Sequence, residues 1–157
     1  LYTERRATAG RMYHVLLAVD DDEERTANQI ETLRSLPGRD ELRVTVVHVH
    51  ETVDAPADEA GRSVIESIND EIGDLQGLPA TATTVRDAVD DLGVPVEVTE
   101  RTGEAAEEVL AEADERDADA ILLAARKRSP AGKALFGSVT QRVIIDGDRP
   151  VIVAGGQ

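Results

Sequence analysis

One stretch of this acidic chain, residues 121–145, combines the residue types that bind anions. It begins with an apolar run long enough for a buried strand, and the basic residues 126–128 (Arg-Lys-Arg) follow that run almost directly. Gly137 and Ser138 then precede a segment with apolar residues at helical spacing. A helix N-terminus presents free N–H groups and the positive end of the helix dipole, and glycine lets a backbone approach a phosphate closely. The stretch therefore predicts an anion site built from a strand, a cationic loop and a helix N-terminus.

The same stretch carries a family resemblance. Gly137 and Ser138 fill the last two positions of the pattern G-x2-G-x9-G-[ST]. The stretch thus resembles the C-terminal signature of the universal stress protein family, in the form found in its ATP-binding members. Counting back along the pattern, Lys127 and Ala124 stand where the two earlier glycines would be. The end of the motif is retained and its beginning differs.

The resemblance extends over essentially the whole chain after Met12, and it implies an adenine-nucleotide site. The ligand it implies is ATP, ADP or AMP, with Mg²⁺ on the phosphates. Asp20 follows the first apolar run, Val49 lies in the second, and the resemblance places both toward the adenosine. The binding residues that it implies are Asp20, Val49, Leu123, Ala124, Arg126, Lys127, Gly137, Ser138 and Val139.

Several of these residues also have plain structural interpretations. Ser138 and Gln141 have the spacing of a capping box, in which Ser138 would simply cap the helix that follows. Val49 would serve equally as a core residue. His48 and His50 lie on the same side of a predicted strand, which suggests a metal pair, although the sequence offers no evident third ligand.

The chain alternates predicted strands with predicted helices. Strands are expected at Met12–Val19, Leu42–His50, Val94–Val98, Ala120–Ala124 and Val151–Ala154. Helices are expected at Glu24–Leu36, with Ala27, Ile30 and Leu33 at helical spacing, at Ser63–Leu75 and Thr83–Leu92 as one bent helix or two, at Glu104–Arg116, and from Ser138 onward. Such alternation requires a layered α/β fold with right-handed crossovers.

The expected architecture is a Rossmann-like sheet of the adenine nucleotide alpha hydrolase type. It has five parallel strands in the order 3-2-1-4-5 with helices on both faces, an order taken partly from the family resemblance. The first and fourth strands are then neighbours, and the direction of winding reverses between them. Ligands of such sheets bind beyond the carboxyl ends of the strands at this switch point. Asp20 and the stretch after residue 124 would both lie there.

Composition excludes several classes of function. A net charge of −15 argues against nucleic acid and against an anionic membrane surface as partners. The chain has no cysteine, which excludes disulfides and thiol catalysis. No apolar run approaches the length of a membrane-spanning helix. We expect residues 1–11 to be a flexible leader, residues 12–157 to form a single domain, and the protein to be cytoplasmic.

The leading functional hypothesis is a homodimeric, nucleotide-binding regulatory protein that is not a committed catalyst. Neither a P-loop nor a G-x-G-x-x-G follows the relevant strands, and no nucleophile–His–acid arrangement is evident. Dimerisation through the last strand, Val151–Ala154, is implied by the resemblance and favoured by its apolar, unpaired edge. The alternatives are an interaction module with a degenerate site and a weak ATPase for which no catalytic base can be named.

The surface composition resembles that of proteins from salt-loving organisms. Acidic residues number 32 against 17 basic ones, and only Lys127 and Lys133 are lysines. Molar salt screens the self-repulsion of such a surface. An ordinary acidic cytosolic protein is the simpler alternative.

We therefore expect the fold to lose stability when KCl is lowered from molar to millimolar concentration, because the screening of the acidic surface is lost. Thermal melts followed by circular dichroism over this range measure the effect. A melting temperature that does not change with salt would remove the halophilic interpretation.

Overall fold

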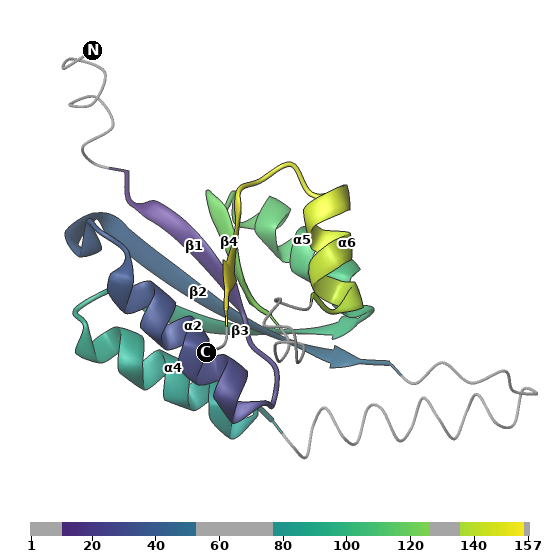
Figure 1. The fold of residues 1–157 in the computed structure, drawn as a ribbon, viewed down its shortest axis with the longest axis horizontal. Helices are drawn as coiled ribbons and strands as arrows, with labels where there is room; N and C mark the ends of the chain where they lie inside the picture. Colours follow the sequence, from purple (N-terminus) through teal and green to yellow (C-terminus); the bar gives the residue numbers. More distant parts are fainter. Residues whose placement is uncertain (1–10, 53–76, 126–135, 156–157) are drawn as a thin grey trace, which may run out of the picture.

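The computed structural model describes residues 11–52, 77–125 and 136–155, which form a layered α/β structure around one sheet (Figure 1). Its five parallel strands lie in the order β3-β2-β1-β4-β5. They are β1 (Tyr13–Ala18), β2 (Leu42–Glu51), β3 (Val96–Gly103), β4 (Ala120–Ala124) and β5 (Val151–Ala154). The helices are α2 (Glu23–Ser35), α4 (Ala80–Asp91), α5 (Ala105–Glu115) and α6 (Ser138–Asp146), with a 3₁₀ turn, η1 (Arg39–Glu41), before β2. The predicted fold class and strand order are confirmed.

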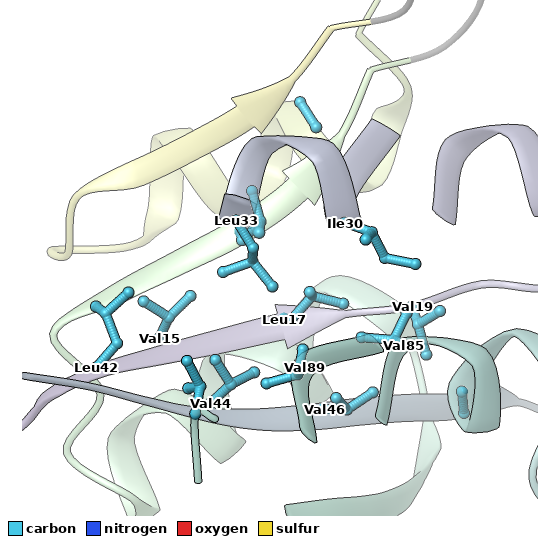
Figure 2. Close-up of a cluster of buried hydrophobic side chains, with 14 residues drawn as sticks. Val15, Leu17, Val19, Ile30, Leu33, Leu42, Val44, Val46, Val85 and Val89 are labelled. Atoms are coloured by element: carbon cyan, nitrogen blue, oxygen red, sulfur yellow. The ribbon is translucent and has the colours of Figure 1, made fainter. Parts of the chain in front are cut away.

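Helices cover both faces of the sheet, which explains the apolar runs of β1 from Val15 and of β4. In Figure 1, α2 and α4 lie on one side of the sheet and α5 and α6 on the other. Alternate residues of β1 enter the two layers: Leu17 packs toward Ile30 and Val85 (Figure 2), whereas Leu16 belongs to the cluster with Val109. Full burial of each such side chain contributes about 1.5–3 kcal/mol. The sequence of a strand that is buried on both faces does not alternate between apolar and polar residues.

The buried face of α2 differs from its prediction. Ala27 is exposed, whereas Thr26 and Gln29 are buried beside Ile30 and Leu33. The two polar side chains are tolerated because each donates a hydrogen bond to a backbone carbonyl. The hydroxyl of Thr26 donates to the carbonyl of Asp22 over 2.8 Å, and the amide of Gln29 donates to that of Ala18 over 2.8 Å. A prediction from residue polarity alone therefore assigns the wrong residues to the buried face of α2.

The third strand also begins and ends later than predicted. It begins after Pro95 and continues to Gly103, five residues beyond the predicted end at Val98. Its sequence becomes polar there because β3 is an edge strand with half-exposed side chains, yet its backbone stays paired with β2 as far as Glu51 and Gly103. Backbone pairing, rather than apolar side chains, sets the length of this strand.

Helix α4 begins directly after Pro79, three residues earlier than the predicted start at Thr83. Proline suits this position because it has no N–H to leave unpaired at a helix start. The predicted helix at 63–75 and most of the predicted leader, residues 1–10, lie outside the described residues. No helix in the described part of the chain is long and apolar enough to cross a membrane.

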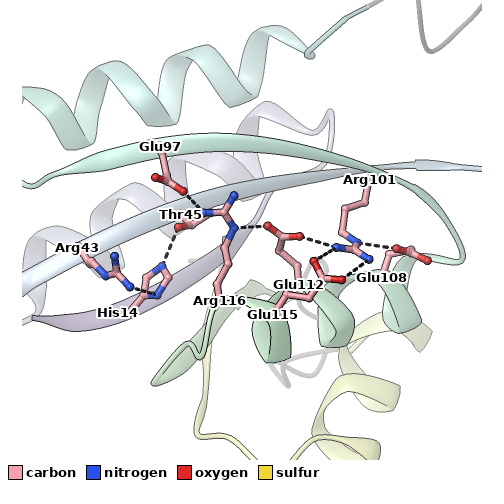
Figure 3. A network of polar contacts seen from close by, with 9 residues as sticks. All are labelled: His14, Arg43, Thr45, Glu97, Arg101, Glu108, Glu112, Glu115 and Arg116. Atoms are coloured by element: carbon pink, nitrogen blue, oxygen red, sulfur yellow. Dashed lines mark hydrogen bonds and ion pairs between the residues drawn. The ribbon is translucent and has the colours of Figure 1, made fainter.

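A buried histidine joins the beginnings of β1 and β2. His14 is 3% exposed, and its Nε2 lies 2.7 Å from the hydroxyl of Thr45 (Figure 3). Its Nδ1 lies 3.1 Å from the guanidinium of Arg43, which can only donate a hydrogen bond. Nδ1 is therefore the acceptor, and the neutral ring carries its proton on Nε2. Burial, followed by the charge of Arg43, lowers the pKa of His14 from its ordinary value of 6.5.

This lowered pKa predicts a loss of stability in mild acid. The unfolded chain takes up a proton at His14 before the folded chain does, so the stability present above about pH 6.5 falls as the pH drops below that value. Between about pH 7.5 and 5.5 the melting temperature of the wild type should fall more steeply than that of His14→Gln, which stays neutral. The variant keeps both other histidines, so the difference in slope reports His14 alone. Equal slopes would show that His14 does not need to be neutral in the fold.

Candidate functional site

A pocket of about 500 Å³ opens at the carboxyl ends of β1, β2 and β4. It lies at the switch point, because β1 leads to α2 on one face of the sheet and β4 precedes α6 on the other. Apolar walls come from Val19, Val49, Val109, Leu123 and Val139. Its polar lining residues are Asp20, Asp21, Arg25, Gln29, His48, His50, Glu51, Ser138 and Thr140.

The structure brings most of the predicted binding residues together around this strand-end pocket. Seven of the nine line it, and they are Asp20, Val49, Leu123, Ala124, Gly137, Ser138 and Val139. The other two, Arg126 and Lys127, lie outside the described residues. Residues from four separate parts of the chain thus share one concave surface, as expected for a switch-point site.

The N-terminus of α6 forms one wall of the pocket. Gly137 is its N-cap, with φ −71° and ψ 169°, and among the described residues no side chain caps this end of the helix. Ser138 is the first helical residue and is exposed, so the interpretation of Ser138 as the cap of a capping box is wrong. Gln141 instead donates its side-chain amide to the carbonyl of Phe136 over 3.1 Å. The first N–H groups of a helix have no partner within it, and these lie where Gly137, Ser138 and Val139 line the pocket.

Ala124 is accommodated without backbone strain. It is the last residue of β4 and is paired with Ala154 of β5. Asp117 is the single non-glycine residue with positive φ in the described part of the chain, so Ala124 has a conformation open to any L-residue. The glycine that the family pattern has at this position is therefore not required by the backbone of this chain.

The opposite wall carries a carboxylate held in place by hydrogen bonds. The Oδ2 of Asp20 lies 2.9 Å from the guanidinium of Arg25, and its Oδ1 accepts a hydrogen bond from the backbone N–H of Asp22 over 2.9 Å. Asp22 in turn caps α2 by accepting from the N–H of Arg25, and this hydrogen bond lowers the pKa of its carboxyl. Asp20 is half exposed and faces the pocket with its charge partly balanced by Arg25.

Three polar side chains bind the end of β1, and the sequence indicated only His48 among them, as half of a metal pair. Gln29 donates to the carbonyl of Ala18, Thr81 donates to that of Asp20, and His48 Nδ1 lies 3.1 Å from that of Val19. Since a carbonyl only accepts, His48 carries its proton on Nδ1. The sequence offered one usable signal, a glutamine four residues before Leu33 on an otherwise apolar helix face. Thr81 gave none, because it precedes the predicted start of its helix.

The histidine pair has partners other than a metal ion. His50 Nε2 lies 3.0 Å from a carboxylate oxygen of Glu100, and the rings of His48 and His50 meet edge to face with centroids 4.7 Å apart. Within residues 11–52, 77–125 and 136–155, no three His, Cys, Asp or Glu side chains form a group that could hold a metal ion. The described structure thus adds no third ligand to the predicted pair.

Comparisons with known proteins agree with the resemblance. The model of the universal stress protein family matches residues 12–155. A universal stress protein from Mycolicibacterium smegmatis is 41% identical over 63 residues, a match that covers 40% of this chain and 48% of that protein, so the chain matches about half the length of this curated relative.

Two solved structures share the fold. The universal stress protein from Archaeoglobus fulgidus in complex with dAMP is 22% identical, with a TM-score of 0.58, over 88% of this chain and 94% of that one. A universal stress protein in complex with cAMP is 15% identical, with a TM-score of 0.61, over 92% of this chain and 98% of that one. At these identities the likeness is one of fold.

Proposed function

Because the chain belongs to the universal stress protein family, we propose that its strand-end pocket binds an adenine nucleotide and that the protein acts as a nucleotide-binding regulator. One observation carries this proposal. A pocket of about 500 Å³ at the switch point is closed on one side by the uncapped N-terminus of α6. This arrangement combines an apolar volume suited to a base with a backbone site suited to phosphate.

The phosphates lie at the N-terminus of α6 in this proposal. Free N–H groups and the helix dipole favour negative charge there, and Gly137 leaves room for a phosphate to approach. In this proposal Arg126 and Lys127, which come shortly after β4 in the sequence, supply positive charge for the phosphates. Mg²⁺ would accompany the phosphates of ATP, because it binds nucleotides mainly through phosphate oxygens and water.

The adenosine lies toward Asp20 and Val49, between the ends of β1 and β2. Relatives of the same fold have been solved with dAMP and with cAMP, which share an adenine and one phosphate. Those two ligands favour an AMP-type nucleotide as the common element, and ATP or ADP would extend from it toward α6. We assign no catalytic residue, and hydrolysis is not part of the proposal.

A degenerate interaction module is the second candidate, because Ala124 and Lys127 replace two glycines of the nucleotide-binding pattern. The replacement at Ala124 is weak support for this candidate, since Ala124 has an ordinary strand conformation.

We place the protein in the cytoplasm of a cell with high internal salt, as part of a response to stress, on the basis of its family and its acidic, lysine-poor composition.

The proposal also includes a homodimer that forms through β5. The two edge strands of the sheet differ in charge, and β5 is the uncharged one. The other edge strand, β3, carries the charged residues Glu97, Glu100 and Arg101, which discourage edge pairing. β5 is Val-Ile-Val-Ala and has no charge. The carbonyls of Pro150 and Ala154 face β4, since the N–H groups of Ile121 and Ala125 donate to them. By alternation, the backbone groups of Val151 and Val153 point outward, where a second copy would pair.

Calorimetry with ATP, ADP and AMP at molar KCl tests nucleotide binding. Gly137→Val should abolish measurable binding of ATP, because its side chain occupies the approach of the phosphate while its φ of −71° suits any residue. Ser138→Ala should weaken binding by about 1 kcal/mol, the value of one hydrogen bond. Ser35→Ala, at the far end of α2, is the matched control and should bind as the wild type does.

The wild type itself decides between the two candidates. If it releases no heat with any of the three nucleotides and none of them displaces a bound fluorescent analogue, the interaction module becomes the better description. Mass spectrometry of the purified protein, searching for nucleotide carried through purification, gives an independent answer.

Sedimentation at micromolar concentration and molar KCl tests the dimer. Val151→Pro should weaken it by on the order of tenfold, because proline removes an outward N–H without removing a hydrogen bond to β4. Val98→Pro makes the same change at the outward edge of β3 and should leave association unchanged. A wild type that sediments as a monomer would rule out the dimer.

A further inference from the structure

We propose that Thr81 is a positioning residue of the nucleotide site: by binding the carbonyl of Asp20 from α4, it fixes the orientation in which the Asp20 side chain meets the ligand. Gln29 and His48 act on the two preceding carbonyls in the same way. This inference rests on the proposed nucleotide site, and it assigns a role to three residues that lie outside the family pattern of the chain.

The backbone at the end of β1 forms part of the pocket wall. Ala18, Val19 and Asp20 all line the pocket, so their conformation sets the shape of one wall. The N–H of Val19 donates to the carbonyl of Val47 over 3.0 Å, the last sheet-like bond that this segment makes with β2. After Val19 the chain turns toward α2. The carbonyls of Ala18, Val19 and Asp20 have side chains as hydrogen-bond partners.

Each of the three partners comes from a different element. Gln29 belongs to α2, is 1% exposed, and directs its amide at the carbonyls of Ala18 on β1 and Leu122 on β4, at 2.8 and 3.4 Å. His48 belongs to β2. Thr81 belongs to the first turn of α4, is 5% exposed, and donates its hydroxyl to the carbonyl of Asp20, which is 61 residues away in the sequence. The segment is therefore held from three directions.

Thr81 is the partner closest to the ligand-facing group. The carboxylate of Asp20 is bound on its other side by Arg25 and by the N–H of Asp22, both of which belong to the same local segment as Asp20. Among the described contacts that hold Asp20, the hydrogen bond from Thr81 is the one that comes from a distant element. Without it the segment could shift as a unit, and a smaller fraction of molecules would present Asp20 in the binding orientation. Apparent affinity falls in proportion to that fraction.

The test compares two valine substitutions on one helix. Thr81→Val removes the hydroxyl and keeps the shape of the side chain. Thr84→Val makes the same change one turn later, where the hydroxyl donates only to the carbonyl of Ala80 in its own helix and is exposed. Affinities for AMP and ATP are measured by calorimetry at molar KCl, well below the melting temperature of each variant.

We expect Thr81→Val to bind AMP and ATP each about fivefold more weakly, the range of one hydrogen bond, and Thr84→Val to bind as the wild type does. Thr81→Ser, which keeps the hydroxyl, should restore the affinity. Equal factors for AMP and ATP are the mark of a change on the adenosine side, whereas Ser138→Ala should affect ATP more than AMP. A purely structural role would lower the melting temperature and leave both affinities unchanged.

Each outcome bears on a separate claim. A wild type that binds neither nucleotide defeats the proposed function. A wild type that binds, with a folded Thr81→Val of equal affinity, overturns the positioning role and leaves the proposed function standing. If Thr81→Val does not fold, Thr81→Ala, which also removes the hydroxyl that binds the carbonyl of Asp20, is measured instead, and unchanged affinity in it overturns the positioning role equally.

Discussion

The structure depends on how the backbone of β1 is satisfied where it leaves the sheet. The helices that follow the adjacent strands β1 and β4 lie on opposite faces of the sheet, and the pairing of these two strands ends at Leu17 and Leu122. A fully buried carbonyl without a partner costs on the order of 1–3 kcal/mol, and the carbonyls of Ala18, Val19 and Asp20 are partly buried at the pocket wall. Gln29, His48 and Thr81 meet this requirement, and in doing so they fix the wall of a pocket. The same chain geometry that creates the unpaired groups also creates the concave site.

A second constraint acts on the other face, where α5 directs acidic side chains toward an arginine of the edge strand β3. Glu112 of α5 is 3% exposed and contacts both Arg101 of β3 and Arg116 (Figure 3). Arg101 also contacts Glu108 and Glu115, and so one guanidinium joins three carboxylates of one helix to the edge strand. The planar fork of an arginine, with five donors, suits this arrangement better than the three donors of a lysine. Arginine in place of lysine therefore has a structural use here, apart from any adaptation to salt.

Much of the fold could be predicted because its signals are apolar patterns. The run from Val15 to Val19 and the run from Ile121 to Leu123 are buried on both sides, and their alternation with helices determines the layered class. The order of strands needed the family resemblance as well. Prediction failed where backbone pairing decides without apolar side chains, as in β3 beyond Val98, and where a polar residue is buried by one hydrogen bond, as at Gln29. The pocket residues after β1, on β2 and β4 and at the start of α6 were predicted through the family resemblance. Thr81, whose hydroxyl binds a carbonyl 61 residues away in the sequence, could not be predicted from either signal.

The departures from the glycine pattern show what each glycine position requires. A glycine can be needed because the backbone has positive φ, or because a side chain would occupy space that a ligand uses. Ala124 has no positive φ and lies in a regular strand, so the first requirement is absent there. Gly137 has φ −71° and does not meet it either, and the remaining reason for glycine at that position is the space in front of the first N–H groups of α6. In the proposed site, the end of α6 therefore matters more than the glycine that the pattern has at position 124.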